Sequence, residues 1–214
     1  MIDIAGLEVR RGDTEVFSGL TMRVAKGEMV RLTGPNGCGK STLLSVLAGL
    51  RVPSSGTVSI AGRLPQDPLV RGLRGFLQEP PPLYEYLTAR EQLALVAGLW
   101  DVRTGALLER ADVLGLTCRQ DVLVGGLSLG QRKKLGYVCA TAHDPQLLLL
   151  DEPFNGLDSA ALTAVVDDLT RRKQEGGTTI VWVSHTDPDA GLADRTIDLG
   201  ARDGSQVLAT GDGE

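Results

Sequence analysis

A glycine-rich segment, Gly34-Pro-Asn-Gly-Cys-Gly-Lys-Ser-Thr42, constrains the fold of this chain more than any other feature. It fits the pattern G-x-x-x-x-G-K-[ST] between an expected strand and an expected helix. Glycines there let backbone N–H groups turn toward phosphate oxygens without a Cβ atom in the way. A glycine turn that merely starts a helix is the alternative, and the full pattern in this context disfavours it.

The loop predicts a nucleotide site with divided roles. We expect Lys40 to reach the β- and γ-phosphates and Ser41 to bind Mg²⁺, while the helix N-terminus adds favourable partial charge. The residues of the loop that we expect to contact the nucleotide are Gly34, Pro35, Asn36, Gly37, Cys38, Gly39, Lys40, Ser41 and Thr42.

Composition limits the remaining possibilities. The 214 residues, 42% of them hydrophobic, suit a single α/β domain over 1–214. The net charge of -5 argues against a protein that binds nucleic acid through general electrostatic attraction to its phosphates. Three cysteines without paired spacing indicate a reducing compartment. The sequence shows neither a signal peptide nor the roughly 18 apolar residues of a membrane span, so we expect a protein that is soluble on its own.

The order of strand-like and helix-like runs predicts an α/β fold. Residues 1–33 form a β-rich entrance, and 80–143 look like a helical subdomain inserted into the core, after a Pro80–Pro82 run. The apolar runs 146–151 and 178–185 suit strands buried on both faces of a parallel sheet, joined by a helix over 161–174. Shorter strands are expected at 57–60 and 73–77.

A second candidate site is the acid pair that follows the apolar run Leu147–Leu150. A strand there would carry Asp151 to its carboxyl end, where it could meet Mg²⁺ through water. Glu152 would orient and deprotonate an attacking water. Alone, such a pair is more often a solvated strand end, but the phosphate loop earlier in the chain favours the catalytic interpretation.

Four further motifs, in order, resemble those of ATP-binding-cassette domains over about residues 2–200. Leu127-Ser-Leu-Gly-Gln131 resembles the family signature, Gln78 the Q-loop, Asn155-Gly-Leu-Asp158 the D-loop and His185 the switch histidine. The resemblance implies a P-loop NTPase parallel-sheet core, an N-terminal antiparallel β subdomain and a helical signature subdomain. It also implies ATP and Mg²⁺ as ligands.

The resemblance assigns roles to these positions. Ser128, Gly130 and Gln131 would face the γ-phosphate of an ATP held by a second subunit, and Asp158 would lie near the nucleotide. Gln78 would bridge Mg²⁺ and the helical subdomain. His185 would contact the γ-phosphate, although a lone histidine at a strand end is more often structural.

Two positions depart from the family pattern. Leu129 stands where the signature usually has glycine. The sequence around it resembles a branch of small exporter ATPases, so we interpret Leu129 as a feature of that branch and not as a sign of an inactive site. Arg11 stands where an aromatic residue commonly stacks on adenine. Its planar guanidinium could stack as well, or it could be a solvated side chain.

The resemblance favours the ATPase subunit of a membrane transporter, an exporter by its branch, that dimerises around two ATP molecules. A homodimer is favoured because both halves of a composite site are present, and the protein would sit on the cytoplasmic face of the cell membrane through its permease. The alternative is a soluble cassette protein of translation or DNA repair, which typically joins two cassettes or inserts coiled coils. A P-loop kinase or GTPase would lack the signature, D-loop and switch histidine together.

The permease is expected to dock in the groove between the nucleotide core and the helical subdomain, along 78–90. Tyr84 and Tyr86 would anchor it, because aromatic residues concentrate interface energy. The alternative is that both tyrosines pack inside the subdomain.

Overall fold

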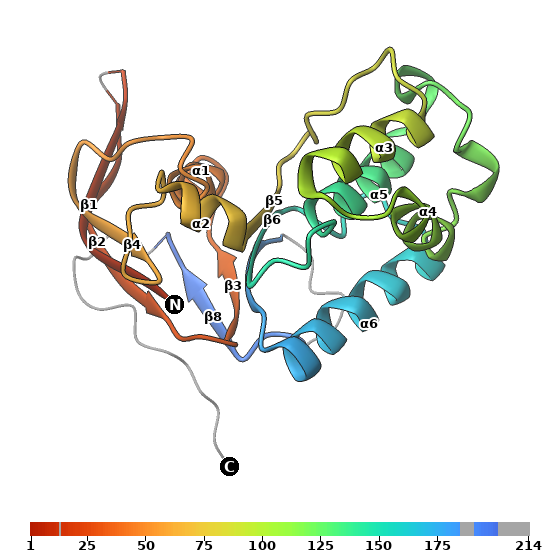
Figure 1. Ribbon diagram of the computed structural model, residues 1–214. Helices are drawn as coiled ribbons and strands as arrows, with labels where there is room; N and C mark the ends of the chain where they lie inside the picture. The colour runs from red at the N-terminus through yellow and green to blue at the C-terminus, as the bar shows by residue number, and fades with distance from the viewer. Residues whose placement is uncertain (13, 185–190, 201–214) are drawn as a thin grey trace.

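The computed structural model describes residues 1–12, 14–184 and 191–200. Within these ranges the strands form an antiparallel sheet of order β2-β1-β4 and a parallel sheet of order β5-β6-β7-β3-β8. Figure 1 shows the antiparallel sheet on one side of the molecule and a group of helices on the other, with the parallel strands between them. The predicted fold class is confirmed.

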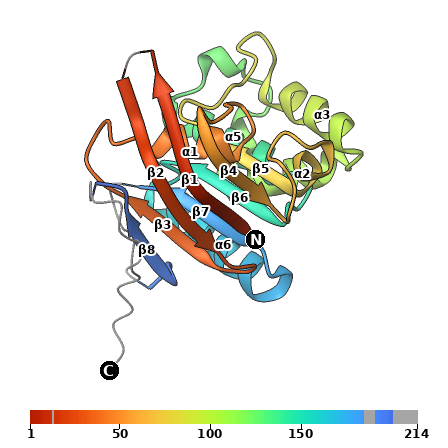
Figure 2. The same ribbon diagram turned by 90° about the vertical axis from the view of Figure 1, so that its left-hand side faces the viewer.

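The antiparallel sheet contains β1 (Ile2–Arg11), β2 (Thr14–Val24) and β4 (Ser55–Ile60). Figure 2 shows these long strands lying across the molecule in front of the parallel sheet. The third strand-like run of the predicted entrance does not join them. It becomes β3 (Met29–Thr33), which pairs in parallel with β7 and β8. This strand was expected before the glycine-rich loop, but its place in the parallel sheet was not.

The parallel sheet is completed by β5 (Arg74–Leu77), β6 (Leu147–Asp151), β7 (Thr179–Val183) and β8 (Arg195–Asp198). Every residue of β6 and β7 is buried, as expected for strands covered on both faces. Neither β8 nor the short helix α2 (Pro68–Leu73) was predicted.

The alternation of side chains along β6 and β7 divides the interior into two cores. Leu147 and Leu149 pack with α1 (Lys40–Leu47) and the antiparallel sheet, whereas Leu148 and Leu150 pack with the helical side of the molecule. Successive strand residues point to opposite faces, so one strand contributes to both cores. This arrangement fixes the carboxyl end of β6 between them.

The helices of the segment 80–143 are α3 (Ala89–Trp100), α4 (Thr104–Val113) and α5 (Leu129–Ala140). Thr88 caps α3 and Ser128 caps α5, each in a reciprocal capping box. The helix predicted over 161–174 is α6 (Ser159–Gly176), which ends at Gly177 with φ 60°.

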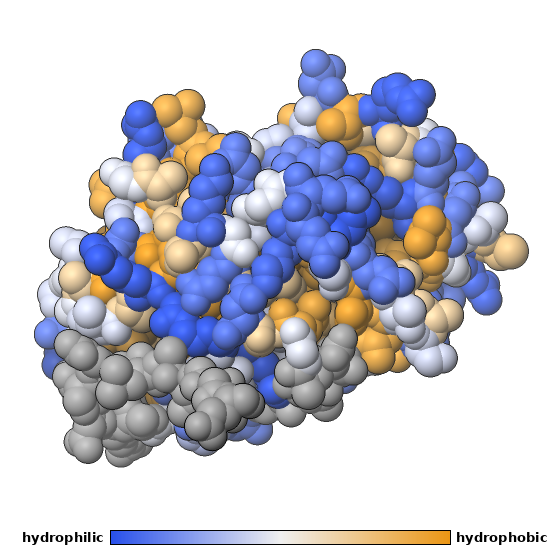
Figure 3. All heavy atoms as spheres, turned by 90° about the horizontal axis from the view of Figure 1, so that it is seen from below, coloured by the Kyte–Doolittle hydropathy of each residue, from blue (hydrophilic) through white to orange (hydrophobic). Residues whose placement is uncertain are grey.

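The surface is mostly polar on the side seen from below (Figure 3), with smaller hydrophobic areas between the charged groups. Among the described residues, the helices are too short or too polar to cross a membrane.

Candidate nucleotide-binding site

The glycine-rich loop connects β3 to the N-terminus of α1, as predicted. Gly34, Gly37 and Gly39 have φ values of 137°, 82° and 103°, a region that side chains disfavour. Space excludes a side chain as well. A Cβ atom on Gly39 would lie 2.5 Å from a methyl carbon of Val16, and one on Gly34 would lie 2.8 Å from Cys38 Sγ.

Lys40 lies at the centre of this loop and is only 7% exposed. Its Nζ atom donates to the carbonyl oxygens of Gly34 at 2.7 Å and Pro35 at 3.1 Å. The N-cap position of α1, Gly39, has no side chain to cap the helix. The first N–H groups of α1 and the ammonium of Lys40 therefore converge on one place, which suits an anion.

Ser41 and Asp151 meet beside the loop. The Ser41 hydroxyl lies beside the Asp151 carboxylate, and Asp151 is 4% exposed. Burial raises the pKa of Asp151, and the carboxylates of Glu152 and Glu79 raise it as well. Ser41 and Lys133 lower this pKa, but the net effect is a rise. A hydroxyl and a carboxylate are the hard oxygen donors that Mg²⁺ prefers, so these two residues fit that ion.

Gln78 follows β5 next to this pair. The pairing of Leu77 with Leu150 in the parallel ladder brings the next residues, Gln78 and Asp151, to the same edge of the sheet. Gln78 is half-buried and also lines a cavity toward the helices. The predicted location of Gln78 at the junction of core and helices thus agrees with its place in the fold.

Glu152 has a backbone conformation that is rare for its type. Its φ is 47°, in the left-handed region. Its N–H donates to the Val183 carbonyl at 2.9 Å, and its own carbonyl accepts from Lys133 Nζ at 2.8 Å and from the Asn155 N–H at 3.3 Å. Strain of this kind is concentrated at functional sites and persists only where the surroundings hold it.

The signature residues lie at the start of α5, among the helices and away from α1 in Figure 1. Ser128 Oγ accepts from the Gln131 N–H at 3.2 Å, and Gln131 Oε1 accepts from the Ser128 N–H at 3.0 Å. Gly130 lies against the D-loop, where a Cβ atom would come 2.4 Å from the Gly156 carbonyl oxygen. Leu129 is 81% exposed, so its side chain points away from the protein.

Asp158 has contacts within the chain that sequence reasoning did not foresee. Its carboxylate caps α6 through the Ala161 N–H at 2.9 Å and pairs with Lys134 Nζ at 2.5 Å. Lys134 lowers the pKa of this carboxyl, and the backbone hydrogen bond adds to the effect. The D-loop is thereby fastened to α5, and the placement of Asp158 near a nucleotide stays a prediction.

Two predicted site residues cannot be placed in the same detail. The backbone of Arg11 ends β1, but its side chain lies outside the described part of the structure, as does all of His185. Sequence reasoning missed Lys133, Lys134 and Glu79, whose contacts connect α5 with the acid pair and the D-loop. The basic run inside the signature helix was the signal that could have drawn attention to them.

Known proteins resemble this chain in sequence and in fold. The family pattern described as ABC transporter matches residues 17–155. The chain belongs to the ABC transporter family. An uncharacterised ABC transporter ATP-binding protein of Bacillus subtilis is 35% identical over 191 residues, which cover 86% of this chain and 61% of the relative. The bacitracin transport ATP-binding protein of Enterococcus faecalis is 33% identical over 188 residues, with the same coverages.

The chain thus spans about three fifths of the length of these two relatives. Among solved structures, a dimeric bacterial ABC transporter cassette matches with a TM-score of 0.83 at 27% identity, covering 94% of each chain. The chain therefore has the family pattern and the fold of an ABC transporter cassette.

Proposed function

We propose that this protein is the ATP-hydrolysing subunit of a membrane transporter, and that two copies close around two ATP-Mg molecules to drive a permease. The position of Ser41 beside Asp151 carries the proposal, because it brings the phosphate loop next to the acid end of β6. A site for phosphate and a site for Mg²⁺ then share one edge of the sheet. Bound Mg²⁺ would neutralise phosphate charge between these two oxygen ligands.

The residues of the loop would bind and orient the nucleotide. The Lys40 ammonium would exchange its contacts with the Gly34 and Pro35 carbonyls for phosphate oxygens. The free N–H groups at the start of α1 would take the remaining phosphate oxygens. Glu152, one residue beyond Asp151, would accept a proton from the attacking water. Gln78 would contact Mg²⁺ and so link the occupancy of the site to the position of the helices.

Two copies are needed because the signature lies at the start of α5, with the helices rather than with α1. The exposed N-terminus of α5, with Ser128 and Gly130, would complete the phosphate site of a second copy. Both halves of such a site occur in this chain, which supports a homodimer. The solved dimeric cassette of similar fold supports the same arrangement.

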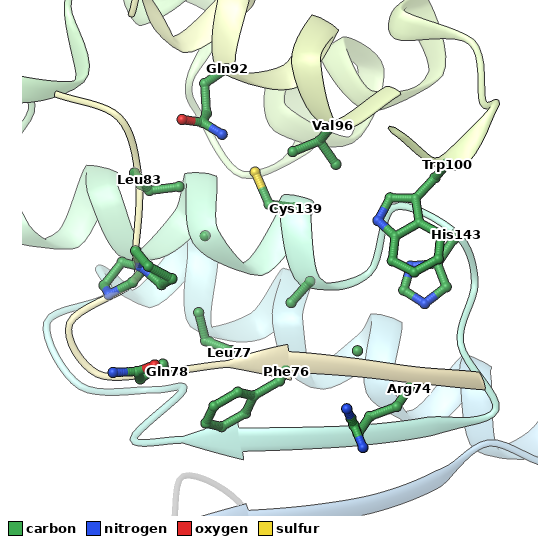
Figure 4. Close-up of a pocket in the computed structure, with 15 residues that line it drawn as sticks. Arg74, Phe76, Leu77, Gln78, Leu83, Gln92, Val96, Trp100, Cys139 and His143 are labelled. Carbon is green, nitrogen blue, oxygen red and sulfur yellow. The ribbon is translucent and has the colours of Figure 1, made fainter. Parts of the chain in front are cut away.

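A permease would dock over the cavity between β5, α3 and α5, on the cytoplasmic face of a membrane. This cavity has a volume of about 220 Å³ and is drawn in Figure 4, where Trp100 stacks on His143 and Gln78 lies at the end of β5. Tyr84 and Tyr86 are 49% and 73% exposed, so they do not pack inside the helical part. The transport of bacitracin named for one relative supports export as the direction.

The purified chain tests this function directly. We expect ATP hydrolysis that requires Mg²⁺ and rises more steeply than linearly with protein concentration, since the active form is a dimer. Light scattering with ATP-Mg and a slowly hydrolysed variant would show the dimer. Turnover that is strictly proportional to protein concentration, from a species that stays monomeric, would contradict the composite site.

A further inference from the structure

Lys133 is a buried cation in the signature helix, and its contacts leave that helix. Its side chain is 5% exposed, and Nζ lies 2.6 Å from the Glu79 carboxylate and 2.8 Å from the Glu152 carbonyl oxygen. Burying an ammonium is costly unless it is paired and hydrogen-bonded. Glu79 follows Gln78 and Glu152 follows Asp151, so both partners belong to the nucleotide side of the structure.

The second contact is made to a strained residue. Glu152 has φ 47°, in the left-handed region, where a non-glycine residue is strained. Val183 fixes the Glu152 N–H, while the ammonium of Lys133 fixes the carbonyl on the other side. The backbone on both sides of the Glu152 Cα atom is therefore tied, and this determines where its carboxylate can lie.

The first contact extends the same connection to the Q-loop. Glu79 directly follows Gln78, and its carboxylate is 38% exposed, so Lys133 is its buried partner. Lys133 also attracts the Asp151 carboxylate electrostatically, while Glu79 and Glu152 repel it. One positive charge from α5 thus pairs with the Glu79 carboxylate and acts on the Asp151 carboxylate of the core.

We propose that Lys133 is a positioning residue for ATP hydrolysis, which holds Glu152 in its left-handed backbone conformation and ties it to Glu79 in the Q-loop. The inference rests on the proposed role of Glu152 in activating water. Lys133 would touch neither the nucleotide nor the attacking water. It acts through Glu152. Because Ser128 caps the same helix α5, a shift of that helix would also move Lys133 and thereby the backbone of Glu152.

The central variant is Lys133→Met, which keeps the length of the side chain and removes both contacts. We expect kcat to fall by about 10- to 100-fold, since displacing a reacting group by about 1 Å has effects of that size. The KM for ATP should stay within about threefold, because the phosphate loop is unchanged. Lys133→Arg, which retains a cation with several donors, should keep kcat within about threefold of the wild type.

A buried cation elsewhere in the chain controls for loss of stability. Arg172 in α6 is also 5% exposed and pairs with Asp168 and Asp144, without a contact to the acid pair. Arg172→Met should lower the melting temperature and leave kcat per folded molecule unchanged. A fall in kcat of equal size in this variant would show that Lys133 matters only for folding.

The same substitution in a Glu152→Gln background separates this proposal from the proposed function. If Lys133 acts through Glu152, Lys133→Met should slow the Glu152→Gln variant no further. A full additional loss in the double variant, or wild-type kcat in Lys133→Met alone, overturns the positioning role and leaves the general base intact. Wild-type hydrolysis by Glu152→Gln itself overturns both.

Discussion

The Ser41 hydroxyl lies beside the Asp151 carboxylate, so the first turn of α1 meets the last residue of β6. These residues are far apart in the chain, and the order β6-β7-β3 of the parallel sheet brings them to one edge. Brought together, their oxygen atoms suit Mg²⁺, next to a loop that suits phosphate. The following predictions start from this edge of the sheet.

Replacing Lys40 by Ala should weaken ATP binding by about 10- to 150-fold, because a hydrogen bond to a charged group contributes about 1.5 to 3 kcal/mol. The ammonium is already held at the loop by the carbonyls of Gly34 and Pro35, so little ordering is needed for it to bind phosphate. Titration with a fluorescent ATP analogue measures the change. Lys26→Ala, which removes a cation from an exposed position, should bind like the wild type. Equal binding by all three proteins would place the nucleotide elsewhere.

Replacing Glu152 by Gln should preserve ATP binding and slow hydrolysis by about 10² to 10⁴, the contribution of a positioned general base. Gln keeps the size of the side chain, so the left-handed backbone and its contacts to Val183 and Lys133 should survive. The variant should accumulate as an ATP-bound dimer in size-exclusion chromatography. Persistent monomer under ATP-Mg would remove the main support for a composite site.

Replacing Tyr84 and Tyr86 together by Ala should leave basal hydrolysis within a few-fold of normal and release the permease. Their rings lie 5.7 Å apart and are exposed, and interface anchors of this type contribute about 2 kcal/mol or more each. Co-purification with the membrane subunit is the measurement. Val113→Ala, which removes another exposed apolar side chain at the end of α4, serves as the control. Undiminished co-purification of the double variant would refute the docking surface.

Replacing Asp168 by Asn should lower stability at neutral pH by about 1 to 3 kcal/mol, the cost of leaving a buried partner unsatisfied. Burial disfavours the charged carboxyl, but Arg172, Tyr137 and Arg171 favour it more strongly, so its pKa lies below the ordinary 3.8. A lowered pKa gives stability above the unfolded-state value that is lost as pH falls through the folded-state value.

The difference between wild type and Asp168→Asn should therefore be constant above about pH 5 and vanish in acid below that lowered pKa. Urea unfolding at several pH values measures it. Asp167→Asn changes a neighbouring exposed carboxylate and should have little effect at any pH. A difference that grows toward acid would contradict the ion pair.

The described structure confirms the elements that have strong local signals. The glycine pattern predicted the loop of 34–42, because positive φ values and close backbone approach require glycine there. The apolar runs predicted β6 and β7, since strands covered on both faces need apolar residues throughout. The exposure of Tyr84 and Tyr86 could not be predicted, because it depends on how the turn before α3 lies over the helices.

By itself, the sequence determined the nucleotide loop, the order of strands and helices and the acid pair at 151–152, because each depends on local residue type and spacing. Only the tertiary structure decided that 29–33 leave the first sheet for the parallel one, because strand pairing depends on partners far along the chain. It also decided that Lys133 and Lys134 serve different loops. Adjacent residues on a helix point in directions about 100° apart, so neighbours in sequence reach Glu152 and Asp158 separately.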